Sequence, residues 1–282
     1  MLEPLLPRDA IEIFYDGTLT EPQLDHAECV AVATDGSVWC GGERGQVFRI
    51  ELDGSALEQV ASTGGFCLGL AFSPAGDLYI CDLKHAAVLR LRAGSDRTEV
   101  FADGFRVPNF PAFGADGGLY VSDSHGMHDP GPGVYRLDPD GSRELWYGEP
   151  VNFANGLALS PDGRFLYVVE TFGNAIFRLK IEEDGSAGAR EEVARFPGVL
   201  PDGIGFAADG SLYVACYEPS MVLRVGADGA VECLVRDEEA HALCHPTNVA
   251  FRGTTLLIAN LGRWHVAAVE VGVEGAPLPP QR

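Results

Sequence analysis

The chain has 282 residues, of which 46% are hydrophobic and 22% are charged, an ordinary composition for one large globular β domain or two smaller ones. Its formal net charge of -21 argues against binding to nucleic acid or to an anionic membrane surface, because both need clustered Lys and Arg. No apolar run approaches the roughly 18 residues that a membrane-spanning helix requires, so no membrane partner is expected.

The cysteines and the N-terminal sequence indicate the cellular compartment in which the protein is expected. Seven cysteines are an odd number, none forms a CxxC pair, and several lie in strand-like apolar runs, where a thiol behaves as a small hydrophobe. The N-terminus, MLEPLLPRDAIEIFYDG, has no basic region leading into a long apolar stretch. The sequence therefore predicts a reduced, cytoplasmic protein without a signal peptide, either a monomer or a small homo-oligomer.

One pattern recurs along the chain: a short apolar strand, a tight turn and a second apolar strand. The copy NGLALSPDG, residues 155–163, shows it most clearly, with Pro161, Asp162 and Gly163 supplying the turn. A period of about 40 to 50 residues made of short strands, without helical periodicity, is typical of propeller blades. The turn glycines of the six copies are Gly36, Gly76, Gly117, Gly163, Gly210 and Gly253.

Each copy continues with a third apolar strand, and all but the last then have a more polar fourth strand. The third strands are expected at residues 47–50, 88–91, 134–137, 176–179, 222–225 and 266–269. Four strands in each of six copies predict an all-β fold, a six-bladed β-propeller of four-stranded blades. No domain boundary interrupts the repeat, so residues 1–282 are expected to form a single domain.

The last copy lacks an outer strand of its own. Residues 10–15, AIEIFY, precede the first copy and have the alternation of a strand. We expect this N-terminal strand to join the last blade and close the ring, because closure removes an exposed strand edge. Two longer departures from the repeat, residues 124–132 and 237–245, are expected to form loops above a central site.

The inner strand of each copy contains three consecutive, mostly apolar residues. We call the six residues that lie two positions before these triplets, one in each copy, the column. Equivalent positions of different blades face one another across the channel of a propeller, so these side chains should converge. Its members are Glu28, Leu68, Asn109, Asn155, Asp202 and Thr247.

The chemistry of the column indicates a cation site. Carboxylate and amide oxygens, without His or Cys, suit a hard divalent cation. Ca²⁺ is the foremost expectation, with Mg²⁺, Mn²⁺ and Zn²⁺ as alternatives. Without a cation, convergence of Glu28 and Asp202 would raise the pKa of one of them through like-charge repulsion. The simpler interpretation is that Asn155 and Asp202, each followed by glycine, are turn residues at strand starts.

The repeat and the column together resemble the SMP-30/gluconolactonase, or regucalcin-like, family of six-bladed propeller hydrolases. The resemblance runs over nearly the whole chain and is most specific in NGLALSPDG and LPDGIGFAADGSLYVACY. It implies that Glu28, Asn155 and Asp202 are direct metal ligands and that Asn109 completes the site or contacts substrate. It also implies lactone hydrolysis, with the metal polarising the carbonyl group and Asp202 acting as the general base.

Several positions depart from the family pattern and bear on the substrate. Val107 stands where the family commonly has an arginine, and Arg106 lies one position further back. Phe110 follows Asn109 in place of an aspartate and makes the pocket more apolar than a sugar lactone would favour. The candidate substrate-binding residues are Asn109, Arg106, Phe110, His125 and Tyr217.

Two other classes of function remain open. The first is a non-enzymatic, regulatory propeller that binds calcium or a small ligand, since fold alone does not fix function. The second is a lyase or condensing enzyme that reuses the fold, as strictosidine-synthase-like propellers resemble it. The leading prediction is a metal-dependent hydrolase of a lactone or related ester.

Overall fold

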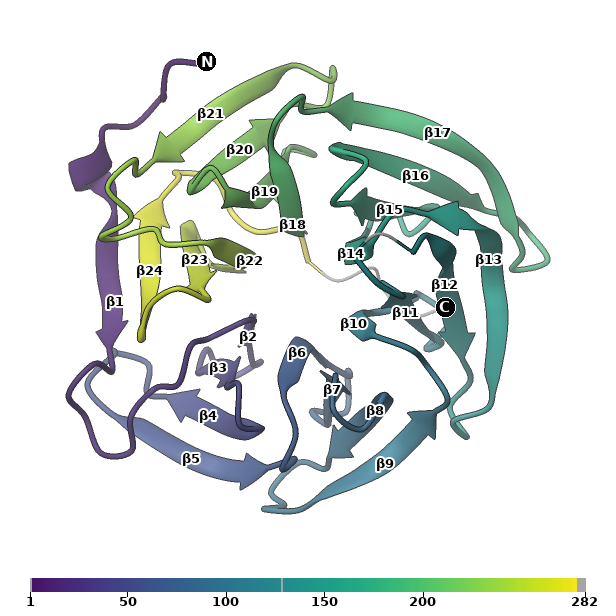
Figure 1. Ribbon diagram of the computed structural model, residues 1–282, viewed down its shortest axis with the longest axis horizontal. Helices are drawn as coiled ribbons and strands as arrows, with labels where there is room; N and C mark the ends of the chain where they lie inside the picture. Colours follow the sequence, from purple (N-terminus) through teal and green to yellow (C-terminus); the bar gives the residue numbers. More distant parts are fainter. Residues whose placement is uncertain (1, 128, 278–282) are drawn as a thin grey trace.

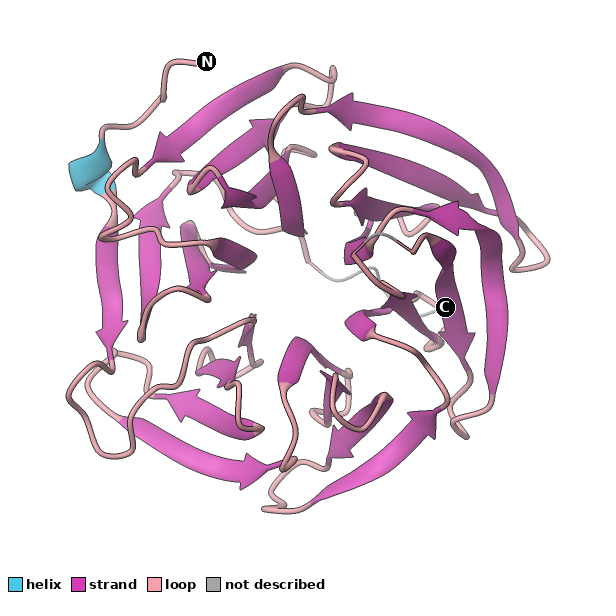
Figure 2. Ribbon diagram, in the orientation of Figure 1, coloured by secondary structure: helices cyan, strands magenta, loops and turns pink. Residues whose placement is uncertain are grey.

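The computed structural model describes residues 2–127 and 129–277. Six four-stranded antiparallel sheets are arranged around a central axis like the blades of a propeller (Figure 1). In the described residues the only helix is the short 3-10 helix η1 (Arg8–Ala10), and the other elements are strands and turns (Figure 2). The predicted all-β, six-bladed architecture is confirmed.

In the first five blades the strands follow one another in sequence from the axis outward, and in the sixth blade the N-terminal strand is the outermost. The first three blades are β2 (Val30–Val32), β3 (Val38–Gly41), β4 (Gln46–Ile50) and β5 (Leu57–Ser62); β6 (Cys67–Phe72), β7 (Leu78–Asp82), β8 (Ala87–Leu91) and β9 (Thr98–Asp103); and β10 (Pro108–Phe113), β11 (Leu119–Asp123), β12 (Gly131–Leu137) and β13 (Arg143–Val151). The next two are β14 (Ala154–Leu159), β15 (Phe165–Glu170), β16 (Ala175–Ile181) and β17 (Ala187–Arg195); and β18 (Leu200–Phe206), β19 (Leu212–Glu218), β20 (Met221–Val225) and β21 (Val231–Arg236). The sixth blade contains β22 (Pro246–Arg252), β23 (Thr255–Asn260), β24 (His265–Glu270) and β1 (Glu12–Asp16).

The N-terminal strand closes the ring, as the sequence predicts. β1 pairs antiparallel with β24, with Glu12 opposite Ala268 and Asp16 opposite His265. The residues before β1 reach the neighbouring blade, because the amide of Leu5 donates to the carbonyl oxygen of Cys233 at 2.8 Å. The N-terminal segment therefore holds the fifth and sixth blades together.

Adjacent inner strands lie close together, which forces small residues at particular positions. A Cβ atom added at Gly156 on β14 would lie 2.5 Å from the backbone oxygen of Asp202 on β18. Glycine is therefore required there, and the close approach holds the start of β14 against the start of β18. We call the face where the inner strands begin the upper face, and the face where they end the lower face.

The arginine that recurs on the third strands of the first five blades forms ion pairs with acidic residues of the same blade. Arg178, for example, lies 2.8 Å from Glu191 on the next strand, and Arg90 lies 2.6 Å from Glu99. These residues are therefore architectural. Within residues 2–127 and 129–277, no helix has the length and apolar character needed to cross a lipid bilayer.

Candidate functional site

The loops of the upper face are anchored by the last residues of the second strands. The carboxylate of Asp123, at the end of β11, accepts hydrogen bonds from the amides of Arg106 and Val107 at 2.8 and 2.9 Å. The carboxylate of Glu170, at the end of β15, accepts one from the amide of Asn152 at 2.8 Å. These bonds fix the segments that lead into β10 and β14, and so fix the column residues at their starts.

Two hydroxyl groups orient the column asparagines. Ser124 Oγ donates a hydrogen bond to the carbonyl oxygen of Ala154 at 2.6 Å and accepts one from Asn109 Nδ2 at 3.0 Å. Thr171 Oγ1 donates a hydrogen bond to the carbonyl oxygen of Pro201 at 2.8 Å and accepts one from Asn155 Nδ2 at 3.1 Å.

The direction of these bonds decides which atom each amide offers. Each hydroxyl donates its one hydrogen to a backbone carbonyl oxygen, so it can only accept a hydrogen bond from the asparagine. The amide atom that faces the hydroxyl is therefore the donor, Nδ2. The carbonyl Oδ1 of Asn109 and of Asn155 is then the atom turned away from the hydroxyl. Both are buried, and an amide oxygen held in this way is a suitable ligand for a hard cation.

Glu28 and Asp202 form an electrostatically strained pair. Burial raises the pKa of Glu28 to about 8, although a hydrogen bond from Thr247 lowers it and the nearby charge of Glu43 adds to the rise. Burial, and next the charge of Glu28, raise the pKa of Asp202 well above its usual value, opposed by a hydrogen bond from Asn155. The two carboxyl groups thus lie close enough to repel each other, with Asn155 beside them.

The residues present fit a divalent cation. Glu28 is half-buried as a residue, but its Oε2 is shielded from solvent and has no hydrogen-bond partner among the described residues. A buried carboxylate oxygen without a partner is costly unless something positively charged or hydrogen-bonding meets it. Oxygen donors from Glu28, Asn155, Asp202 and Asn109 match the preference of Ca²⁺ or Mg²⁺.

Tyr217 lies beside this carboxyl pair, at the upper end of β19. Burial and the charges of Glu28 and Asp202 raise its pKa. Its ring stacks on that of His245, with ring centroids 4.4 Å apart, and His245 Nδ1 lies 3.0 Å from the backbone oxygen of Tyr217. His245 ends the loop 237–245, whose position above the site the repeat predicts, but nothing in the sequence indicates the stack.

The other predicted substrate-binding residues are more scattered. The Arg106 side chain is 60% exposed, and its Nη1 donates to Asp129 Oδ2 at 2.7 Å. Phe110 is partly buried and packs between blades. His125 follows Ser124 in a left-handed conformation with φ 59, and its Nε2 is buried without a partner among the described residues.

A second group of possible metal ligands lies on the rim. Potential ligand atoms of Asp25, His26 and Glu43 all lie within 4.8 Å of one another. Within residues 2–127 and 129–277, this is the one cluster of three or more His, Cys, Asp or Glu side chains at such distances. We call it the rim triad. Asp25 Oδ2 already accepts hydrogen bonds from Arg44 Nε and Gln46 Nε2, both at 3.0 Å. No sequence pattern pointed to it.

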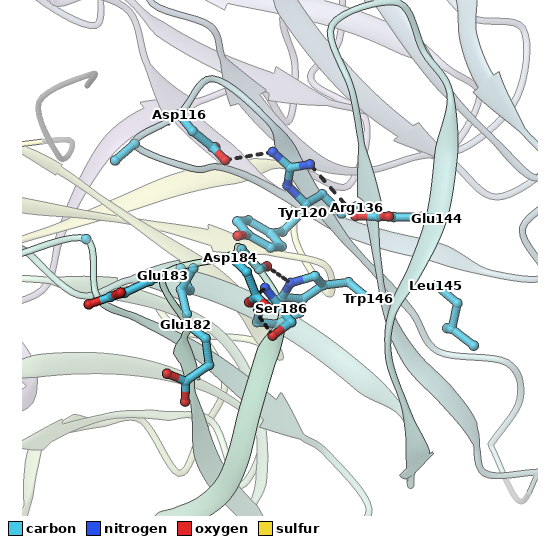
Figure 3. Close-up of a pocket in the computed structure, with 14 residues that line it drawn as sticks. Asp116, Tyr120, Arg136, Glu144, Leu145, Trp146, Glu182, Glu183, Asp184 and Ser186 are labelled. Atoms are coloured by element: carbon cyan, nitrogen blue, oxygen red, sulfur yellow. Dashed lines mark hydrogen bonds and ion pairs between the residues drawn. The ribbon is translucent and has the colours of Figure 1, made fainter.

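A surface cavity of about 530 Å³ lies between the third and fourth blades on the lower face (Figure 3). Arg136 meets Asp116 at 2.6 Å and Glu144 at 3.8 Å, and Trp146 Nε1 donates to the backbone oxygen of Gly185 at 2.7 Å. None of the column residues lines it. Its polar groups largely satisfy one another, so it is a weaker candidate for catalysis than the column.

Residues 26–259 match the model of a family described as the SMP-30/gluconolactonase/LRE-like region. The chain belongs to this family. It is 35% identical over 126 residues to the 6-deoxy-6-sulfogluconolactonase of Pseudomonas putida, an alignment that covers 44% of this chain and 42% of that protein. The chain therefore aligns with less than half the length of this curated relative.

Solved structures of known proteins share the whole fold. A gluconolactonase from Xanthomonas campestris has a TM-score of 0.77 at 22% identity, with 94% of this chain and 89% of the other covered. A calcium-binding protein, regucalcin, from Agrobacterium tumefaciens has a TM-score of 0.76 at 18% identity, with both chains fully covered at 100%. At such low identity these likenesses concern the fold, while the family match comes from sequence.

Proposed function

We propose that the protein is a divalent-metal-dependent hydrolase acting on a lactone or a related ester. The observation that carries this proposal is the pair of Glu28 and Asp202: burial raises the pKa of both carboxyl groups, and the charge of Glu28 raises the pKa of Asp202 further. Family membership and a relative named as a sulfogluconolactonase support the same reaction class.

In this proposal Glu28, Asn155, Asp202 and Asn109 hold the cation, Ca²⁺ foremost. Bound there, a divalent cation would polarise the ester carbonyl group and lower the pKa of the neighbouring carboxyl groups. Asp202 takes a proton from the water as its oxygen bonds to the carbonyl carbon; the ring C–O bond then breaks, and Asp202 returns the proton to the leaving oxygen, which gives the open-chain hydroxy acid. Tyr217, His125, Phe110 and Arg106 are the proposed substrate contacts.

The substrate follows from the same residues. The stacked rings of Tyr217 and His245 give the mouth an apolar and aromatic character, and Arg106 is already paired with Asp129. A lactone with few hydroxyl groups suits these surroundings better than a polyhydroxylated sugar lactone.

A panel of aliphatic, aromatic and sugar lactones tests this proposal, each assayed with and without chelator. Hydrolysis should require the cation and should fall in Asp202→Asn, which keeps the shape of the side chain but cannot accept the proton. Glu43→Gln in the rim triad is the matched control and should keep activity. Hydrolysis that persists after chelation and in Asp202→Asn would overturn the mechanism, and cation binding without hydrolysis of any ester would favour a binding protein.

A further inference from the structure

A cavity of about 280 Å³ occupies the propeller axis below the column. All six inner strands contribute to its wall, and none of the four proposed ligands lines it. Its lower end is bordered by Ala276 and Pro277, because the segment after β24 runs toward the middle of the ring (Figure 1). The amide of Ala276 donates to the backbone oxygen of Phe206 at 2.9 Å, which holds this segment in place.

The sequence of the inner strands explains the space. At one level every inner strand has a small residue, and at the next level each has a larger apolar residue. The small residues are Ala31, Ala71, Ala112, Ala158, Gly205 and Ala250. The larger ones are Val32, Phe72, Phe113, Leu159, Phe206 and Phe251.

One side chain in this wall differs from all the others. Asn248 on β22 has the only hydrogen-bonding side chain among the described residues that line the cavity, apart from backbone groups. Only 2% of its surface is exposed, and its Oδ1 accepts a hydrogen bond from the amide of Val30 at 3.3 Å. The other inner strands have Cys29, Gly69, Phe110, Gly156 and Gly203 at the equivalent position.

The amide nitrogen of Asn248 lacks a hydrogen-bond partner within residues 2–127 and 129–277. Its Nδ2 is buried, and no described residue accepts a hydrogen bond from it. The bond from Val30 fixes the amide orientation, because only Oδ1 can accept from a backbone N–H. A donor so buried normally has a partner, and leaving it unsatisfied costs stability.

We propose that this axial cavity is a second ligand site, which takes a small, uncharged and largely hydrocarbon molecule with one hydrogen-bond-accepting oxygen. The apolar wall and the single donor match the usual character of a small-molecule site. An anion is disfavoured, because no described lining residue is cationic and the Glu28 and Asp202 pair lies above. An intact lactone has the required chemistry, whereas its open-chain carboxylate product does not.

The site goes beyond the proposed hydrolase, because it uses neither the cation nor Asp202. Cyclohexanone is a suitable probe: it has one carbonyl oxygen and contains no ester to hydrolyse. Cyclohexane lacks the oxygen, and hexanoate has six carbons but carries a charge. Binding is followed with chelator present, by the NMR signal of the Asn248 side-chain amide and by calorimetry.

Cyclohexanone is expected to bind saturably and to shift that amide signal, while hexanoate does not bind. Asn248→Leu should weaken cyclohexanone binding about tenfold and change cyclohexane binding less than twofold. Ala158→Leu fills the cavity while leaving Asn248 in place, and it should abolish binding of both molecules. It also keeps the test decisive if Asn248→Leu fails to fold.

The proposal is overturned if the binding of cyclohexanone does not saturate, which would mean that the cavity holds water alone. It is equally overturned if Ala158→Leu binds cyclohexanone as well as the unaltered protein does, or if Asn248→Leu binds it equally well. Lactone hydrolysis measured on the same variants reports separately on the proposed function.

Discussion

The upper face contains two acidic groups that differ in how their charges are compensated. In the rim triad, Arg44 and Gln46 already donate to Asp25, and His26 Nδ1 lies 3.2 Å from Glu43. In the column, Glu28 Oε2 is buried without a partner among the described residues. The rim carboxylates are therefore already compensated, whereas the column has the larger need for a cation, because burial raises the pKa of both of its carboxyl groups.

The variant with the largest expected effect is Asp202→Asn. It keeps the shape of the side chain and removes the charge, so it should lower kcat for lactone hydrolysis by about 10²- to 10⁴-fold. It should also weaken cation binding, which calorimetry measures. The result contradicts the assignment if Asp202→Asn hydrolyses lactones at an undiminished rate while a rim variant does not.

Glu28→Gln tests the column through stability. The pKa of Glu28 is raised to about 8 in the folded protein without cation, above its usual value of 4.5. The folded state then binds more protons than the unfolded state between these two values, so stability falls as pH rises from about 4.5 to about 8. Asp202 acts in the same direction.

Denaturant unfolding in chelator, at pH 5 and at pH 8.5, measures this effect. We expect the free energy of unfolding to decrease at the higher pH by a few kcal/mol, and saturating Ca²⁺ to restore it. Glu28→Gln should remove much of this decrease and weaken the stabilisation by Ca²⁺. A pH dependence equal in the two proteins would show that Glu28 is not the titrating group.

Thr171→Val should have a smaller effect. It keeps the shape of the side chain but removes the hydroxyl that receives Asn155 Nδ2 and donates to Pro201. Asn155 then loses its fixed orientation, and cation affinity should fall about 10-fold. Calorimetric titration with Ca²⁺ measures this.

Ser124→Ala is the matched variant for Asn109, because it removes the equivalent hydroxyl. It should weaken cation binding to a similar degree if Asn109 is a ligand. If Asn109 contacts substrate instead, KM should rise while cation affinity stays the same. Unchanged affinity in both variants would contradict a role for these hydroxyls in orienting the ligands.

The sequence predicts the ring well, because the blades depend on a repeat. Six copies of one unit set the blades, and the same register brings Glu28 and Asp202 together although they are far apart in the chain. It predicts the surrounding contacts poorly. The stack of Tyr217 on His245 and the bonds of Ser124 and Thr171 join neighbouring blades through loops of irregular length, and the repeat does not fix these contacts.

The smallest expected effect is that of Glu43→Gln in the rim triad. The charge of Glu43 is the smallest of the causes that act on the pKa of Glu28, so its removal should shift the titration of Glu28 only slightly toward lower pH. Cation affinity at pH 8 should change less than about threefold, because exposed charges are well screened by solvent. A large loss of cation binding in Glu43→Gln, together with normal binding in Glu28→Gln, would reverse the comparison. It would mean that His26 and the rim carboxylates hold the cation despite their existing partners, and that the buried Oε2 of Glu28 is not a cation ligand.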